Sequence, residues 1–138
     1  MTAPLVGIDI SEPARLRDRL KNSPDLAQEL FHPGERSYCE RQRNPEQHLA
    51  ARFSAKEAVI KALGIDGFDP LDVEVIAGGE NCDVRLHGAA ARRADELDVH
   101  VTISLTHLDG MAGAVALALP SSLVIGPRTG PYMLDTSA

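Results

Sequence analysis

The sequence predicts an α+β domain in which one long helix packs on an antiparallel sheet. Residues 46–63 indicate the helix, because they are rich in Ala, Leu, Glu, Lys and Gln, which are strong helix formers. The second half of the chain indicates the sheet, because its apolar residues alternate with polar ones. A chain of 138 residues, 43% apolar and 25% charged, fits one globular domain. We expect this domain to cover residues 1–119 and residues 120–138 to form a loosely ordered tail.

The N-terminal elements are a strand and three short helices. Apolar residues 5–10 predict the strand. Ser11 is a favourable N-cap residue, and we expect the first helix to run from there to about Lys21. Proline-containing breaks then delimit two further helices, over residues 25–31 and 35–43.

The long helix over residues 46–63 has Gly64 as its C-terminal cap. Its larger apolar residues recur at three-, four- and seven-residue spacing and predict one stripe that faces the core. The residues of this stripe are Leu49, Phe53, Ile60 and Leu63. Glu57 lies at the edge of the stripe and Lys61 one turn beyond it. A carboxylate and an amine are therefore expected at the boundary of the core.

The second half is expected to form strands and one further helix. The strands are predicted around residues 73–75, 84–86, 99–106 and 111–119, and the helix at residues 89–97. Turn residues Leu108-Asp109-Gly110 predict a hairpin between the last two strands. The strand Met111–Leu119 is apolar on both faces, so it is either central in the sheet or covered by a partner chain.

Charge and cysteine content narrow the class of protein. A formal charge of -6 argues against a general nucleic-acid binder, which needs a basic surface to neutralise phosphates. Cys39 and Cys82 are too few for a disulfide framework and lack the paired spacing of a zinc site, which favours a reducing compartment. With no basic leader and no run of about 20 apolar residues, we expect a cytoplasmic protein that is not in a membrane.

Two acidic residues occupy positions where a solvent-exposed carboxylate is not expected. Asp9 interrupts the apolar first strand, and Glu57 borders the apolar face of the long helix. A buried carboxylate is costly unless it is paired or bound to a metal. One reading is a shared Mg²⁺, which takes one or two carboxylates together with water and substrate phosphate. The other is that each acid pairs with a lysine or arginine.

The histidines and the first helix offer weaker signals. His107 continues the inward parity of its strand and lies at the strand end, where it is either ligand-facing or structural. The other four histidines, which have no metal-ligand spacing, are interpreted as structural; they are His32, His48, His87 and His100. The basic residues of the first helix are either a docking patch for an acidic partner or a solvated helix face. They are Arg15, Arg17, Arg19 and Lys21.

Three segments in order resemble the acyl-carrier-protein synthase type of 4'-phosphopantetheinyl transferase. Val6–Ile10 resembles the family's first strand with its aspartate, and Arg15 follows six residues after Asp9. Ala51–Gly64, with Phe53 before Lys-Glu-Ala and a second lysine, is similar to the central motif. Val101–His107, followed by the apolar run 112–118, resembles the third motif. The resemblance covers residues 6 to 119.

The resemblance implies a reaction and a role for each matching residue. Phosphopantetheine is moved from coenzyme A, the co-substrate, to a serine of a carrier protein. Asp9 and Glu57 would ligate Mg²⁺, and Glu57 would act as base for the serine hydroxyl. Lys61 would bind and stabilise or protonate the leaving 3',5'-ADP. Arg52 and His107 would bind nucleotide phosphates, while the carrier would be met by Arg15, Arg17 and Arg19.

The resemblance also implies the phosphopantetheinyl transferase-like fold, a homotrimer, and a carrier that is a discrete protein or a domain of a fatty-acid or polyketide synthase. Two segments depart from the family pattern: residues 80–83 in place of a Gly-Lys-Pro sequence, and the loop 64–70. These departures leave the adenine-side contacts open. The alternatives are a coenzyme A-binding module that has lost catalysis and a metal-dependent hydrolase of diphosphates.

Overall fold

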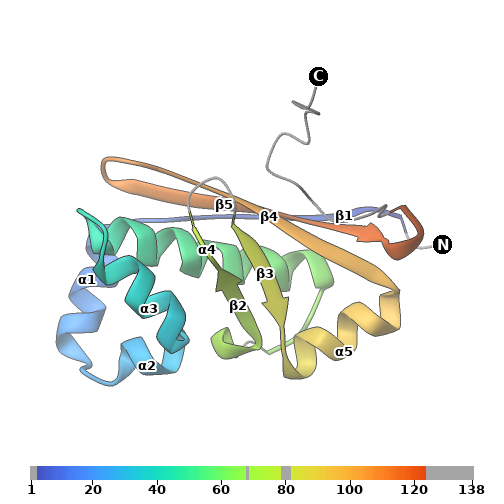
Figure 1. Cartoon of the computed structure of the whole chain (residues 1–138), viewed down its shortest axis with the longest axis horizontal. Coiled ribbons are helices and arrows are strands. Elements are labelled where there is room, and N and C mark those ends of the chain that lie inside the picture. Colours follow the sequence, from blue (N-terminus) through green and yellow to red (C-terminus); the bar gives the residue numbers. More distant parts are fainter. Residues whose placement is uncertain (1–2, 68, 79–81, 124–138) are drawn as a thin grey trace.

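The chain is arranged in three layers around its long central helix (Figure 1). A computed structural model describes residues 3–67, 69–78 and 82–123. A three-stranded antiparallel sheet covers one side of α4 (Pro45–Leu63), and the shorter helices with a two-stranded sheet cover the other side. The predicted α+β class, with a long helix packed on an antiparallel sheet, is confirmed.

The elements follow the expected order along the chain. The helices besides α4 are α1 (Pro13–Asn22), α2 (Leu26–Leu30), α3 (Pro33–Glu40) and α5 (Gly88–Leu97). The strands are β1 (Leu5–Ser11), β2 (Val73–Ile76), β3 (Asp83–Leu86), β4 (Val99–Leu108) and β5 (Met111–Pro120). Two short 3₁₀ helices are η1 (Pro70–Asp72) and η3 (Ser121–Leu123). None of the helices within the described ranges is long and apolar enough to cross a membrane.

The larger sheet has the strand order β1-β5-β4, so β5 is its central strand as one reading of the sequence predicted. The expected hairpin joins β4 to β5 and pairs Leu108 with Met111. Gly110 adopts a positive φ of 80° in this turn, a conformation that glycine tolerates without strain. The smaller sheet pairs β2 with β3 antiparallel.

The prediction of a single core-facing stripe on α4 was wrong. Most of the helix circumference is buried, because the large sheet covers one side and the third layer covers the other. Small residues make this possible, since they allow both layers to approach the helix axis. The fully or nearly fully buried alanines of α4 are Ala50, Ala51, Ala55, Ala58 and Ala62. The helix α4 is therefore the middle layer of the protein, with a hydrophobic contact on each side of it.

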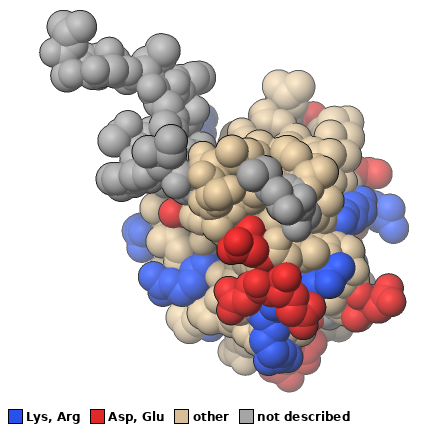
Figure 2. Space-filling model, turned by 90° about the vertical axis from the view of Figure 1, so that its right-hand side faces the viewer, with Lys and Arg blue, Asp and Glu red and all other residues tan. Residues whose placement is uncertain are grey.

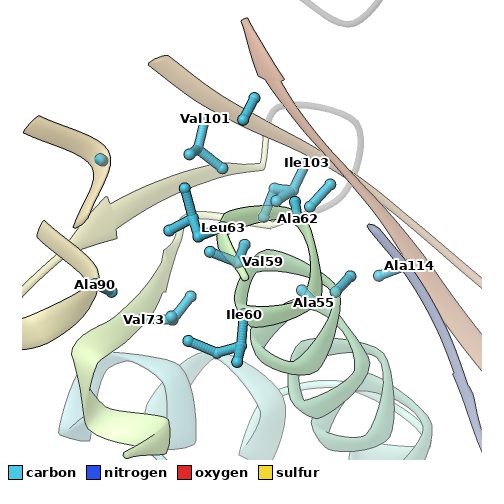
Figure 3. Packing of buried hydrophobic residues seen from close by; sticks show 14 of the residues in the cluster. Ala55, Val59, Ile60, Ala62, Leu63, Val73, Ala90, Val101, Ile103 and Ala114 are labelled. Atoms are coloured by element: carbon cyan, nitrogen blue, oxygen red, sulfur yellow. The ribbon is translucent and has the colours of Figure 1, made fainter. Parts of the chain in front are cut away.

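The core at the C-terminal half of α4 joins several elements (Figure 3). Val59 and Leu63 of α4 lie among Val73 of β2 and Val101 and Ile103 of β4. All five side chains are at most 5% exposed. Burial of an aliphatic side chain of this size contributes about 1.5–3 kcal/mol, so this cluster is a main source of stability.

Close packing of β1 on α4 depends on Gly7. A Cβ atom at this position would lie 1.9 Å from the carbonyl oxygen of Ala58, which is far inside van der Waals contact. Only glycine therefore allows the strand to lie against the helix backbone. The contact brings the residues that follow Gly7 in β1 alongside the middle of α4, where Glu57 and Lys61 lie.

An ion pair is buried between α3 and α4. Nζ of Lys56 lies 2.8 Å from Oε1 of Glu35, and both side chains are fully buried. The ammonium also donates to the carbonyl oxygens of Pro70 and Val73, while the backbone N–H of Val75 donates to Glu35. Burial lowers the pKa of Lys56, and the neighbouring Glu35 opposes that shift. The pair ties three segments of the third layer to α4.

Several element boundaries differ from the sequence prediction. Ser11 is not the cap of the first helix: it ends β1, and its hydroxyl lies 2.8 Å from that of Ser54. Glu12 takes the N-cap position instead. The third helix begins at Pro33, two residues early, and ends at Glu40, three residues early. β5 continues to Pro120 and is followed by η3, and the rest of the expected tail, residues 124–138, lies outside the described residues.

Candidate functional site

The fold brings together three of the residues that the sequence singled out. Asp9 comes from β1, and Glu57 and Lys61 lie one turn apart on α4. Nζ of Lys61 lies 3.2 Å from Oδ1 of Asp9 and 3.1 Å from the carbonyl oxygen of Ile8. The Asp9 side chain is 18% exposed and that of Lys61 is 55% exposed. The cluster is thus anchored in the fold and open to solvent.

The cluster contains more negative than positive charge. Burial raises the pKa of Glu57, the nearby Asp9 raises it further, and Lys61 opposes the shift. Within the described part of the chain, the side chain of Glu57 has no hydrogen bond or ion pair of its own. Two carboxylates therefore share one ammonium group. The sequence-based alternative, in which each acid has its own basic partner, holds for Asp9 and not for Glu57.

The donor set of this cluster suits a hard cation. Carboxylate oxygens are the ligands that Mg²⁺ prefers, and Mg²⁺ usually retains several waters and adds phosphate oxygens of a substrate. The raised pKa of Glu57 reflects an uncompensated carboxylate, which a cation would compensate. Lys61 occupies one oxygen of Asp9, so an ion would use the other oxygen or displace the ammonium. The residues fit Mg²⁺ on these grounds.

A second cluster lies toward the N-terminal end of α4. It combines two residues that the sequence singled out, Arg52 and His107, with two that it did not. His107, at the exposed end of β4, contacts His48 of α4 edge to face, with ring centroids 5.0 Å apart. His48 in turn contacts Tyr38 of α3 at 5.9 Å. Burial lowers the pKa of His48, and His107 and Arg52 lower it further. His107 itself is exposed beyond the core, although it keeps the predicted strand parity.

Arg52 lies inside the protein rather than on its surface. Its side chain is 2% exposed, and its guanidinium stacks on the ring of Tyr38, 4.2 Å from the centroid. It donates a hydrogen bond to the carbonyl oxygen of Ala77, while its Nε has no partner among the described residues. The structure therefore places Arg52 and His107 in one aromatic cluster with Tyr38 and His48, distinct from the contacts of Asp9 and Lys61.

The basic residues of α1 are exposed. Leu16 is buried beneath the helix, and Arg15, Arg17 and Arg19 are on its solvent side together with Lys21. Nε of Arg17 lies 3.6 Å from Oδ1 of Asp18, so one charge is partly compensated within the helix. The remaining positive charges are free to meet an acidic surface.

Sequence reasoning missed Tyr38 and His48. A signal for His48 was present, since it lies four residues before Arg52 and therefore shares its helix face. No comparable signal exists for Tyr38, which lies on another helix. Of the segments that depart from the family pattern, residues 68, 80 and 81 lie outside the described residues.

Comparison with known proteins gives a consistent result. A family model described as the 4'-phosphopantetheinyl transferase superfamily matches residues 5–117. The chain is 43% identical over 116 residues to a holo-[acyl-carrier-protein] synthase from Moorella thermoacetica, which covers 80% of this chain and 90% of that protein. Among solved structures, an acyl carrier protein synthase from Mycobacterium tuberculosis is 34% identical, with a TM-score of 0.68, covering 84% of this chain and 96% of that one. A "Chronobacterium ammoniagenes ACPS-CoA complex" is 26% identical, with a TM-score of 0.75, covering 85% and 97%.

Proposed function

Because the chain belongs to the 4'-phosphopantetheinyl transferase superfamily, we propose that it transfers the 4'-phosphopantetheine group of coenzyme A to a serine of an acyl carrier protein. The observation that carries the proposal is the meeting of Asp9, Glu57 and Lys61 at one open edge of the fold. The similarity to a holo-[acyl-carrier-protein] synthase and to a structure titled as a coenzyme A complex supports the identity of both substrates.

Asp9 and Glu57 are the proposed ligands of Mg²⁺. Their oxygens supply the donor type that this ion prefers, and together with Lys61 they leave a net negative charge. When bound, the ion neutralises negative charge on the diphosphate of coenzyme A as it is cleaved. The fit of these residues is the support for the assignment.

The protein groups in the proposed transfer have distinct tasks. Glu57 accepts the proton of the serine hydroxyl as the general base. The serine oxygen then forms a bond to the phosphorus that carries the pantetheine arm. The bond from that phosphorus to the bridging oxygen breaks, and 3',5'-ADP leaves. Lys61, one turn from Glu57, stabilises or protonates the leaving phosphate.

We assign the nucleotide phosphates to the neighbourhood of Arg52 and His107. His107 is exposed at the end of β4 and can meet a phosphate directly. Arg52 is buried, so it contributes positive potential from within the cluster unless its side chain moves. Burial is the main cause of the lowered pKa of His48, and His107 and Arg52, the two groups assigned to the phosphates, lower it further.

The carrier is proposed to dock on α1 through Arg15, Arg17 and Arg19. These residues concentrate positive charge on a chain whose net charge is -6, which favours an acidic partner. α1 and α5 lie at opposite ends of the molecule (Figure 1). The face at the α5 end carries acidic and basic side chains side by side (Figure 2), so it offers a less uniform surface to a charged partner.

We further propose a homotrimer assembled through the outer face of the large sheet. This face exposes large apolar side chains of β1, β5 and the hairpin, which are Val6, Ile8, Ile10, Leu108, Met111 and Val115. It also holds a concave, mostly apolar hollow of about 260 Å³. An apolar surface of this kind is normally covered. Light scattering should give about three times the 14.8 kDa of one chain, and a species of 14.8 kDa alone at micromolar concentration would exclude the trimer.

A cytoplasmic location is part of the same proposal. Cys39 is a buried thiol that forms no disulfide, and burial raises its pKa to about 11. A thiol of this kind fits a reducing compartment.

One incubation tests the proposed reaction. The protein is mixed with coenzyme A, Mg²⁺ and an apo carrier protein, and the carrier is weighed by mass spectrometry. A gain of one phosphopantetheine that requires all components is expected. Binding of coenzyme A without transfer would favour the non-catalytic module, and cleavage of coenzyme A without a carrier would favour a diphosphate hydrolase. A panel of carriers then identifies the preferred partner.

A further inference from the structure

We propose that His32, Glu74 and His87 form a binding site for a divalent transition-metal ion such as Zn²⁺. Each residue comes from a different segment: the N-cap of α3, the strand β2 and the N-cap of α5. The site lies in the third layer, on the opposite side of α4 from the large sheet (Figure 1). It is separate from the Asp9 and Glu57 pair and does not depend on the proposed reaction.

The three side chains converge closely enough to share one ion. One nitrogen of each imidazole and one carboxylate oxygen all lie within 4.8 Å of one another. Nε2 of His87 lies 2.9 Å from Oε1 of Glu74, and the two imidazole centroids are 5.2 Å apart. Ligand atoms at about 2.0–2.2 Å from Zn²⁺ are themselves roughly 3–3.5 Å apart in a tetrahedral shell. Small side-chain rotations therefore suffice to form the site.

His32 is held in a position that suits a ligand. Its Nε2 lies 2.8 Å from the carbonyl oxygen of Leu71, and its backbone N–H donates to Oε1 of Glu35 at 2.9 Å. A hydrogen bond from Nε2–H to Leu71 puts the lone pair of the neutral ring on Nδ1. Metal-binding histidines commonly donate their second ring N–H to a backbone carbonyl in this way, which fixes the ring and its tautomer. The His32 side chain also faces the backbone N–H of Glu35 in the capping box of α3, so a metal bound at Nδ1 would replace that capping contact.

The other two residues are also fixed by the backbone. Glu74 stands between the buried Val73 and Val75 in β2. The backbone N–H of His87 donates to the carbonyl oxygen of Asp72 at 2.7 Å. Zn²⁺ would replace the hydrogen bond between His87 and Glu74, and the proton on Nε2 of His87 would pass to Nδ1 of the same ring or to solvent. Little of the backbone has to be ordered on binding.

The donor chemistry selects the class of ion. Two imidazole nitrogens and one carboxylate oxygen suit Zn²⁺ and its neighbours, whereas Mg²⁺ prefers oxygen ligands alone. The side chains of His87 and Glu74 are 38% and 18% exposed, so the ion can enter and water can complete its shell. Arg85 lies 3.9 Å from Glu74, but its side chain is 66% exposed and can turn away. The two metal sites of the protein therefore differ in preference.

The test measures Zn²⁺ binding by titration calorimetry, with Mg²⁺ in excess to fill the oxygen site. Wild type is expected to bind one Zn²⁺ per chain at this place, and Co²⁺ should give a visible absorption spectrum there. Glu74→Gln and His87→Gln should each lose at least about tenfold in affinity, a size reached even by loss of an outer-shell partner. His32→Asn should do the same while keeping a good N-cap.

His100→Gln is the matched control, because His100 is exposed on β4 and lies outside the cluster. Unfolding midpoints in chelator show that each variant is folded, and added Zn²⁺ should raise the midpoint of wild type and His100→Gln but not of His87→Gln. Zn²⁺ affinity within about threefold of wild type in both His32→Asn and His87→Gln, or no Zn²⁺ bound by wild type with Mg²⁺ present, would overturn the proposal.

Discussion

Helix α4 carries two lysine–carboxylate groups that differ in almost every physical respect. Lys56 and Glu35 are both fully buried. The ammonium donates to Glu35 and to two backbone carbonyl oxygens, and both carboxylate oxygens accept hydrogen bonds. Lys61 is only five residues beyond Lys56 on α4, and its partner Asp9 lies on β1. The Lys61 side chain is nevertheless 55% exposed, and the neighbouring Glu57 side chain has no partner of its own within the described residues. The first group is neutral as a whole, and the second has one negative charge to spare.

The difference separates a structural role for compensated, buried charges from a binding role for uncompensated, accessible ones. The buried Lys56–Glu35 pair can only hold segments together, because its charges compensate each other and a ligand cannot reach it from solvent. The group formed by Asp9, Glu57 and Lys61 is open to solvent and has one uncompensated carboxylate. A cation and a diphosphate can therefore reach it and bind. On one helix, Lys56 is therefore interpreted as structural and Glu57 and Lys61 as functional.

Glu57→Gln gives the sharpest test of that division. Loss of the charged ligand and base should lower the rate of phosphopantetheine transfer by roughly 10²–10⁴-fold, the range for general acid–base catalysis. The unfolding midpoint should hardly change, since the Glu57 side chain makes no hydrogen bond within the described residues. Mass spectrometry of the carrier measures the rate, and Glu46→Gln on the same helix is the control. Near-normal turnover at low Mg²⁺ would show that Glu57 is misassigned.

Lys56→Met and Lys61→Met form a matched pair on the same helix. Lys56→Met leaves Glu35 buried without its partner and should lower the free energy of unfolding by about 3–5 kcal/mol. Lys61→Met should leave stability nearly unchanged and slow transfer instead. Denaturant unfolding at equal protomer concentration measures the first effect. Adding Glu35→Gln to Lys56→Met should recover part of the loss, and equal stability of the two single variants would contradict the comparison.

Arg15→Glu with Arg19→Glu extends the comparison to charges that are fully solvated. Reversal should raise the KM for the carrier by about tenfold, because repulsion replaces a salt-screened attraction. The KM for coenzyme A should stay within a small factor, and added salt should weaken wild type in the same direction. An unchanged carrier KM would make α1 an ordinary solvated face. Loss of coenzyme A binding would move Arg15 to the nucleotide site.

The smallest expected effect concerns stability against pH without metal. The pKa of Glu57 is raised in the folded state, so the unfolded chain loses this proton first as pH rises. The stability linked to Glu57 is full below its unfolded pKa and is lost as pH passes the folded pKa. In chelator, Glu57→Gln should therefore gain in unfolding midpoint relative to wild type between acid and neutral pH. Mg²⁺ should reverse the difference, and a constant offset across this window would argue against the raised pKa.

Local patterns in the sequence were enough for the order and type of the elements. Strong helix formers ended by Gly64 predicted α4, and Asp109-Gly110 predicted the β4–β5 hairpin. They also predicted that Glu57 and Lys61 share a helix face, because residues four apart do so in any α-helix. The family motifs pointed to Asp9 as their companion, and the structure brings these three residues together.

Burial was decided by the tertiary structure. The prediction of a single apolar stripe on α4 was wrong because the helix is covered on two sides. Many of its buried residues are alanines, which do not stand out as an apolar pattern in the sequence. Arg52 became an interior residue only because Tyr38 of another helix lies under its guanidinium. The burial of Lys56 and Glu35 likewise follows from the fold, which encloses both side chains between α3 and α4.

The meeting of His32, Glu74 and His87 also belongs to the tertiary structure. Their spacing along the chain fits no metal motif, and each was interpreted from sequence as structural or was passed over. Local sequence determines hydrogen bonding and side-chain direction within a helix or strand, since these depend on near neighbours. Which side chains from separate segments converge depends on how the layers pack, and that is fixed by the sum of many contacts across the core rather than by any one segment.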